Sequence, residues 1–350
     1  MKKTVILILF LILSTNIFSQ TTDVLTGLTQ PISLTFKGNI LYYAEYNGGN
    51  GKISMINVNT PIVPIEVIQN TDWSIGLIFN GGDLYFGQII DNNLSKIDIN
   101  NIPSGVTEII SGIRPYDFAL DGNMLYISAY VENKIFKIDI SSSNPTLIEV
   151  VGGLSTPYGI ALHNDELYIS EYDGNRVSKI NITESNPTVQ EVVTNVMGPS
   201  GLCFAGNILF IAEAEGNKVS HINVLANQSS VTETVSNLSE PSGLAIYNDE
   251  LYITEYTGNK ISKIGISSIL STSEVTVQND RINLFPNPAV NFITIDGLIK
   301  LKEYKIFTVT GMKVYDGLLN ASKTIDVSML SSGIYVLSLE NGIRLKFIKK

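Results

Sequence analysis

Apolar and polar residues alternate with a period of two in many short segments, and these segments recur along most of the chain. Residues 94–99 (Leu-Ser-Lys-Ile-Asp-Ile) are one example: the alternation places apolar side chains on one face, as in a half-buried β-strand. A second segment carries one aromatic residue in each repeat, at Tyr42, Tyr85, Tyr126, Tyr168, Phe210 and Tyr252. The spacing of 41 to 43 residues between these aromatics predicts six repeats built from strands.

Each repeat predicts four antiparallel strands. The first begins with a segment of the type Pro-x-Gly-Leu, and a short turn such as 121–123 (Asp-Gly-Asn) joins it to the second. The third has the Ile-Ser-Lys-Ile pattern, and 190–193 (Gln-Glu-Val-Val) is an example of the fourth. Four strands in about 42 residues form one propeller blade. The sequence therefore predicts an all-β, six-bladed β-propeller; a β-solenoid, which needs shorter repeats, is the weaker alternative.

The sixth repeat, which runs from Pro241 to Ile266, lacks a fourth strand of its own. Residues 22–28 near the start of the chain match the fourth strands of other repeats, such as 149–154. We therefore expect the N-terminal strand to complete the last blade. That pairing would close the ring and leave no exposed edge, with the propeller spanning residues 21–268.

These repeats resemble the NHL-like and gluconolactonase-like six-bladed propellers over about residues 21–270. The resemblance implies the fold, while propellers host hydrolases, lyases, scaffolds and binding modules alike. It also implies that a metal-dependent lactonase would carry Glu, Asn and Asp on the innermost strands, just before the repeated Gly. In this chain those positions hold Ile32, Ile75, Tyr116, Tyr158, Ser200 and Ser242, with no carboxylate among them.

The first twenty residues predict a signal peptide. Two lysines, Lys2 and Lys3, precede an unbroken apolar run over 5–13, and small or polar residues follow. The run is too short to span a bilayer, which makes a membrane anchor the weaker interpretation. No cysteine follows it, which excludes a lipoprotein anchor, and no later segment predicts a transmembrane helix.

The repeats end at residue 268, and we interpret the segment that follows, 269–281, as a linker. Residues 282–350 contain short alternating segments separated by Gly and predict a small β-sandwich. Three blocks stand out in order: a Pro-Asn-Pro opening, a Thr-Gly-x-x-Val centre and a Ser-Gly-Ile-Tyr strand, before a basic C-terminus. The motif residues are Pro286, Asn287, Pro288, Gly311, Gly333 and Tyr335.

This tail resembles the type A C-terminal sorting domain of the type IX secretion system. The resemblance implies a Bacteroidota protein that reaches the periplasm and is recognised through its tail by the type IX machinery. It also implies transport across the outer membrane, removal of the tail by a sortase-like peptidase, and release or attachment at the cell surface. An Ig-like adhesion module is the alternative interpretation of the sandwich.

Charge and composition exclude several functions. Residues 21–280 carry 11 basic and 28 acidic side chains, which argues against a nucleic-acid partner. The single cysteine, Cys203, cannot form an intramolecular disulfide and fits a small core residue. His163 lies in a turn at the face opposite the predicted ligand site, and His221 replaces a Lys of the repeat, so no Ser-His-Asp set can form.

The loops before the first strand and after the second strand of each blade lie on one face, here called the mouth. This placement makes a set of carboxylates and aromatic residues the candidate ligand-binding residues: Glu45, Trp73, Arg114, Tyr116, Tyr130, Tyr158, Glu171, Tyr172, Glu213, Glu255 and Tyr256. Aromatic faces of this kind attract sugars and cations.

The four glutamates allow three interpretations. They could bind a Ca²⁺ ion, which takes oxygen ligands, or a sugar or cationic peptide beside the tyrosines. Alternatively, each accepts N–H bonds from a neighbouring loop, and their repetition favours this structural role. Our first hypothesis is a non-catalytic binding module for a glycan, a peptide or a surface protein. The alternative is a metal-dependent hydrolase or lyase of the gluconolactonase-like type.

Overall fold

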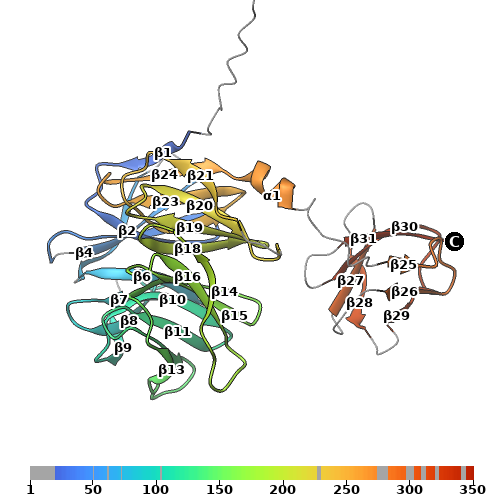
Figure 1. Cartoon of the computed structure of the whole chain (residues 1–350), viewed down its shortest axis with the longest axis horizontal. Coiled ribbons are helices and arrows are strands. Elements are labelled where there is room, and N and C mark those ends of the chain that lie inside the picture. Colours follow the sequence, from blue (N-terminus) through green and yellow to red (C-terminus); the bar gives the residue numbers. More distant parts are fainter. Residues whose placement is uncertain are drawn as a thin grey trace, which may run out of the picture. The chain divides into compact units, whose positions relative to one another are not determined.

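The computed structural model describes residues 20–49, 51–60, 63–71, 73–102, 105–226, 230–273, 283–296, 303–308, 313–319, 323–339 and 344–350. The predicted signal peptide falls almost wholly outside them. The chain divides into two compact units, Met1–Ser271 and Thr272–Lys350 (Figure 1). Each is considered by itself.

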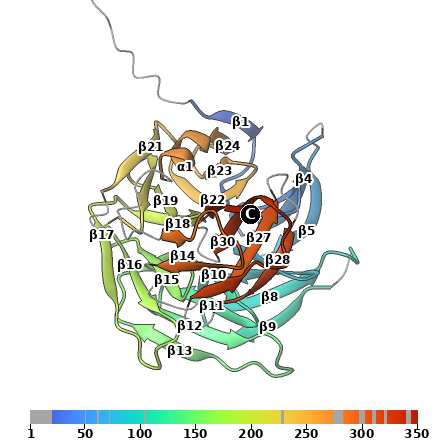
Figure 2. The same ribbon diagram turned by 90° about the vertical axis from the view of Figure 1, so that its right-hand side faces the viewer.

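The first unit is a six-bladed β-propeller. Within the described residues it contains six four-stranded antiparallel sheets, and Figure 2 shows them following one another around a ring. Blades one to three comprise β2 (Pro31–Lys37), β3 (Ile40–Glu45), β4 (Gly51–Asn57) and β5 (Ile65–Thr71); β6 (Ser74–Asn80), β7 (Asp83–Gln88), β8 (Asn93–Asp98) and β9 (Thr107–Ser111); and β10 (Pro115–Asp121), β11 (Met124–Ala129), β12 (Lys134–Asp139) and β13 (Ile148–Gly152).

Blades four to six continue the same order around the ring. They comprise β14 (Pro157–His163), β15 (Glu166–Glu171), β16 (Arg176–Asn181) and β17 (Gln190–Thr194); β18 (Pro199–Ala205), β19 (Ile208–Glu213), β20 (Lys218–Asn223) and β21 (Thr232–Ser236); and β22 (Pro241–Tyr247), β23 (Glu250–Glu255), β24 (Lys260–Gly265) and β1 (Thr22–Thr26). The first strand of each blade contacts the first strands of both neighbouring blades, and β22 contacts β2.

The N-terminal strand is the outer strand of the sixth blade. β1 pairs antiparallel with β24, with Thr22 opposite Lys263 and Thr26 opposite Lys260. Beyond the end of β1, Leu28 N donates to Asn259 O at 3.0 Å, so the segment that leads from β1 to β2 of blade one also contacts blade six. Strands from the two ends of the unit thus share one sheet, which covers the edge that β24 would otherwise expose.

Period-two alternation explains where the core lies. In the third strands, one residue of each blade is fully buried between neighbouring sheets: Ile53, Leu94, Ile135, Val177, Val219 and Ile261. The repeated aromatic of the second strand is also buried, and in four blades a third-strand lysine lies over it, as Lys179 does over the Tyr168 ring at 5.8 Å. The pattern that predicted strands is therefore the pattern that packs the blades.

The start of the expected linker is helical instead. Helix α1 (Ser267–Ser273) follows β24, and its Ile269 and Leu270 pack against the apolar core of blades five and six. Leu270 N donates to Ile266 O at 3.1 Å. The sequence predicted a linker here and no helix, whereas burial of two adjacent apolar side chains favours this one short helix.

The second unit contains two antiparallel sheets around one core. One comprises β25 (Asn283–Phe285), β26 (Phe292–Asp296) and β29 (Thr324–Asp326); the other comprises β27 (Glu303–Thr308), β28 (Lys313–Leu318), β30 (Gly333–Leu339) and β31 (Arg344–Lys349). Both sheets supply the same core, which includes Ile293, Ile306, Leu337 and Phe347. This arrangement is a small β-sandwich.

Three of the tail's motif residues, Asn287, Tyr335 and Gly333, have a structural role in the sandwich. The Asn287 amide accepts a bond from Ile348 N at 2.9 Å and donates to Lys346 O, so the opening segment is tied to β31. Tyr335 donates to Ser331 O at 2.9 Å, and Gly333 begins β30. Pro286 and Pro288 are exposed beside Asn287, whereas Gly311 lies outside the described residues.

Removing residues 21–28 tests the closure of the ring. The deletion removes β1 from its place beside β24. It also removes the half-buried side chains of Val24, Leu25 and Leu28, which pack against a buried apolar cluster, so the free energy of unfolding should fall by about 3 kcal/mol or more. Urea unfolding of the mature chain measures it. Asp23→Asn is the control, because it keeps the strand and removes only an exposed ion pair with Lys260. Equal midpoints for the deletion and the control would contradict this role for β1.

Candidate functional site

A cavity of about 180 Å³ opens at the mouth of the propeller. Its walls come from the start of the first strands and the end of the second strands, as the sequence argument expected. The lining residues are Ile32, Trp73, Ile89, Tyr116, Tyr130, Tyr158, Tyr172, Ser200, Ala214, Glu240, Ser242 and Tyr256. Six of the predicted candidates, Trp73 and five tyrosines, therefore line one cavity.

The tyrosines on the side of blades three and four form a packed cluster. The rings of Tyr116 and Tyr158 stack with centroids 3.9 Å apart, and Tyr130 meets Tyr158 edge-on at 5.8 Å. Tyr172 extends the cluster, 4.6 Å from Tyr158. On blade two, Trp73 stacks on Tyr46 at 4.5 Å. Such contacts hold large aromatic surfaces in fixed orientations before any ligand arrives.

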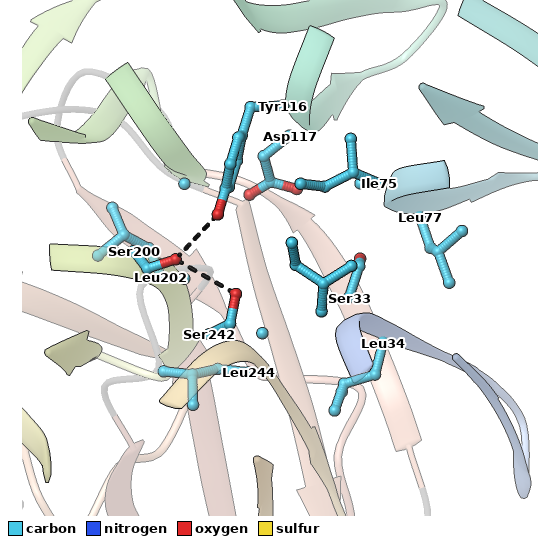
Figure 3. A pocket seen from close by; sticks show the side chains of 15 residues that line it. Ser33, Leu34, Ile75, Leu77, Tyr116, Asp117, Ser200, Leu202, Ser242 and Leu244 are labelled. Atoms are coloured by element: carbon cyan, nitrogen blue, oxygen red, sulfur yellow. Dashed lines mark hydrogen bonds between the residues drawn. The ribbon is translucent and has the colours of Figure 1, made fainter. Parts of the chain in front are cut away.

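A row of hydroxyl groups crosses the floor of the cavity. The Tyr116 hydroxyl lies 3.4 Å from Ser200 Oγ, which lies 3.4 Å from Ser242 Oγ (Figure 3). These residues come from blades three, five and six, and they also line a narrower channel below the mouth. The cavity thus combines aromatic walls with a few polar groups, the composition usual for small-molecule sites.

The phenols around the cavity remain neutral at physiological pH. Burial, together with the neighbouring phenols and Asp173, raises the pKa of Tyr158 to about 12. Burial also raises the pKa of Tyr116 well above its usual value. For Tyr130, burial raises the pKa while the nearby Arg114 opposes that shift. These hydroxyls can therefore donate hydrogen bonds to a ligand.

The four predicted glutamates do not line the cavity. Glu171 is fully buried in blade four, where its carboxylate accepts a bond from Ser155 N at 2.8 Å. Arg176 donates two bonds to the same carboxylate, at 2.8 and 2.7 Å. Burial alone would raise the pKa of Glu171, but the bonds from Arg176 hold it below its usual value. Ser155 lies in the loop that joins blades three and four.

The other three glutamates repeat this arrangement. Each is at most 2% exposed and accepts a main-chain N–H from the loop that enters its own blade. The pairs are Glu45 with Thr29 N, Glu213 with Met197 N and Glu255 with Ser239 N, at 2.8 to 2.9 Å. Among the described residues, no group of three His, Cys, Asp or Glu side chains could hold a metal ion. The four glutamates therefore accept main-chain N–H bonds from neighbouring loops, the role that their repetition favoured, and they are not among the residues that line the cavity.

A carboxyl that the sequence argument missed, Asp117, lines the channel below the mouth. The repeat has Gly at this position in four blades because the neighbouring backbone comes close: a Cβ at Gly159 would lie 2.2 Å from Ser200 O. In blade three, Asp117 Oδ2 instead accepts a bond from Ile160 N of blade four at 3.0 Å. Burial raises the pKa of Asp117 to about 7 despite main-chain N–H bonds that lower it.

Glu240 was also missed, although a signal existed. It lines the cavity from the position just before the first strand of blade six. Trp73 and Arg114 hold the same position in blades two and three, so this one position of the repeat varies strongly around the mouth. Arg114 itself is exposed, and its Nε donates to Asn92 Oδ1 at 2.7 Å.

The remaining titratable candidates lie away from the cavity. His163 stacks on Phe204 with centroids 4.5 Å apart, and His221 Nδ1 lies 2.8 Å from Thr234 Oγ1. Burial lowers the pKa of both histidines. Burial also raises the pKa of the Cys203 thiol to about 12, so this thiol stays protonated.

The tail matches a known family model. Residues 283–350 match the secretion system C-terminal sorting domain. The match indicates export by the type IX secretion system, to the cell surface or beyond it. No helix within the described residues is long and apolar enough to cross a membrane.

Solved structures similar to this chain are propeller proteins of varied function. Virginiamycin B lyase from Staphylococcus aureus is 19% identical, with a TM-score of 0.54 over 70% of this chain and 98% of the lyase. A nidogen–laminin complex chain is 18% identical, with a TM-score of 0.55 over 67% and 90%. A putative gluconolactonase is 13% identical, with a TM-score of 0.58 over 71% and 92%. At these identities the likeness shows the fold alone, and a search of curated proteins finds no match.

Glu171→Gln tests the structural role of the buried glutamates. The variant should lose about 1–3 kcal/mol of stability, because Arg176 faces an amide N–H in place of a carboxylate oxygen. Urea unfolding with and without Ca²⁺ measures this, and Ca²⁺ should change neither protein. The exposed Glu184→Gln has the same charge change and should unfold like the wild type. A large Ca²⁺ stabilisation that Glu171→Gln abolishes would contradict this role.

Asp117→Asn tests the raised pKa of the channel carboxyl. Native Asp117 keeps its proton up to about pH 7, while the unfolded chain releases it near pH 4. The contribution of Asp117 to stability should therefore fall as the pH rises from about 4 to 7, by about 1.4 kcal/mol for each unit of the upward shift. The two histidines, whose pKa values burial lowers, contribute in the opposite direction in the wild type and the variant alike. The variant should lack this fall in urea unfolding, whereas the exposed Asp121→Asn on the same strand should keep it. An unchanged pH dependence in Asp117→Asn would refute the assignment.

Proposed function

We propose that the propeller is an exported, non-catalytic binding module whose mouth cavity takes a chemical group of a glycan, a peptide or a surface protein. The single observation that carries this proposal is the preformed cavity of about 180 Å³. Its aromatic walls and hydroxyl floor suit a ligand with apolar faces and a few polar groups.

The distribution of repeated and non-repeated residues supports a ligand site at the mouth. Residues that recur in nearly every blade, such as the buried glutamates, serve the blade itself. Several cavity residues break the repeat: Trp73, Ala214 and Glu240 each differ from the residues at the same position in other blades.

A metal-dependent hydrolase or lyase of the gluconolactonase-like type is the alternative. Such an enzyme needs several oxygen ligands that converge on one point in the mouth. The four repeated glutamates, Glu45, Glu171, Glu213 and Glu255, are instead engaged within their blades, and Asp117 is a lone carboxyl in the channel. This donor set favours binding over catalysis and gives no reason to assign Ca²⁺ or another cofactor.

We further propose the export route. Residues 1–20 act as a signal peptide in a Bacteroidota cell, the chain reaches the periplasm, and the type IX machinery recognises the sandwich at 282–350. Because helix α1 packs on the propeller core, the linker begins after it rather than at residue 269. The propeller that is delivered starts near residue 21.

The proposed binding role can be tested with the chain's single tryptophan, because Trp73 lines the cavity. We expect a ligand from a glycan array or a peptide array to change the fluorescence of Trp73. Tyr158→Ala should weaken its binding about tenfold by removing the central ring of the cluster. The exposed tail variant Tyr315→Ala should bind like the wild type. Failure of both arrays to yield a ligand, or unchanged binding by a folded Tyr158→Ala, would refute the proposal.

A further inference from the structure

Blade five breaks the pattern of the mouth at Ala214. The residue after the second strand is Tyr in four blades, at Tyr46, Tyr130, Tyr172 and Tyr256, and Ile89 in blade two. Ala214 lines the cavity between Tyr172 of blade four and Tyr256 of blade six. Blade five therefore has a methyl group where four other blades have a tyrosine ring. We call this part of the cavity, lined by Ala214, Tyr172, Tyr256 and Glu240, the Ala214 notch.

One carboxylate, that of Glu240, lines the notch, and a second, that of the exposed Glu215, lies beside Tyr172. Glu240 lines the same cavity, and it acts on the rings at both sides: besides burial, it raises the pKa of Tyr172 and of Tyr256. Glu215 also acts on Tyr172 through a hydrogen bond. The main chain of Glu240 is held on both sides: its N donates to Asn217 Oδ1 at 2.9 Å, and its carbonyl accepts a bond from Tyr256 N at 3.1 Å. The described residues show no hydrogen-bond partner for its carboxylate.

Basic side chains at this face of the propeller are engaged elsewhere. Four of them form ion pairs with the buried glutamates: Lys52 with Glu45, Arg176 with Glu171, Lys218 with Glu213 and Lys260 with Glu255. Arg114 is bonded to Asn92 and lies near Tyr130, in blade three. The charge at the notch, in blades five and six, therefore stays negative.

We propose that the Ala214 notch binds an organic cation, with the charged group between Tyr172 and Tyr256 and with Glu240 and Glu215 as counter-charges. This inference rests on the proposed function and names its ligand class. The faces of tyrosine rings attract cations, and the attraction grows where water is excluded. The apolar body of the ligand lies against Trp73, Ile89 and Ile32, which line the rest of the cavity.

Two matched pairs of probes test the charge requirement by calorimetric titration of the mature chain. Choline is compared with its uncharged isostere 3,3-dimethyl-1-butanol, and Nα-acetyl-lysinamide with Nα-acetyl-norleucinamide. The cationic member of at least one pair should bind about tenfold more tightly. A preference in the first pair identifies a small quaternary ammonium, and a preference in the second identifies a peptide side chain. Either preference supports the inference.

Three variants locate the site. Glu240→Gln should reduce the preference for the cation about fivefold or more and leave binding of the neutral isostere unchanged. Ala214→Tyr should abolish binding of the cation, because it restores the ring that other blades carry and fills the notch. The repeat itself shows that a blade accepts Tyr at this position. Glu184→Gln, an exposed carboxylate in a turn at the opposite face, should bind as the wild type does.

The outcomes separate this inference from the proposed function. Equal binding of cation and isostere, or a cation preference that survives in folded Ala214→Tyr and Glu240→Gln, overturns the cationic class. If the arrays yield a Tyr158-dependent ligand while no cation binds, the mouth is a binding site for another class and only this inference fails. If neither the arrays nor the cations bind, both proposals fail.

Discussion

The mouth of this propeller depends on buried glutamates that hold the loops between blades. Each accepts a main-chain N–H from the loop that enters its own blade, and a basic side chain offsets its charge. In blade six, Ser239 N donates to Glu255, and Ser239 directly precedes Glu240. This bond therefore sets the position of a cavity residue. In blade four, Glu171 accepts the bond from Ser155 N, and Ser155 lies three residues before Tyr158. Removing such a carboxylate would leave a buried N–H without a partner and release the loop that carries the site.

Strand alternation explains why the sequence argument identified the tyrosines of the cavity but misplaced the glutamates. Glu171 and Tyr172 are adjacent, and adjacent side chains at the end of a strand point to opposite sides. One of them faces the cavity while the other lies inside the blade. The sequence places both at the mouth end of β15, but which side faces the channel depends on how the blades pack.

Asp117 and Glu240 were missed for a different reason. The sequence argument followed the positions that repeat, and both residues are departures from the repeat. Asp117 stands where close backbone packing favours Gly, and only the contact with Ile160 N shows how a carboxyl fits there. Glu240 shares its position with Trp73 and Arg114, so variation at one position of the repeat was the available signal. The repeats, the strands and the six blades were predictable because they rest on short-range alternation. Helix α1 was not, since seven residues are too few to show a helical period.

The same division between repeated and non-repeated residues explains how the propeller can change its ligand without losing its fold. The buried apolar residues recur in all six blades and the buried glutamates in four, so a change in one cavity residue leaves the other blades intact. Ala214 shows this most clearly, because blades with Tyr at the same position have the same four strands. A single small side chain among tyrosines opens space beside Glu240, while the ion pairs within the blades engage nearby basic groups. The negative charge of residues 21–280 then adds a field that draws cations toward the ring before contact. Selectivity among cations would come from the shape of the notch. The attraction for a cation would come from the Glu240 carboxylate, for which the described residues show no hydrogen-bond partner.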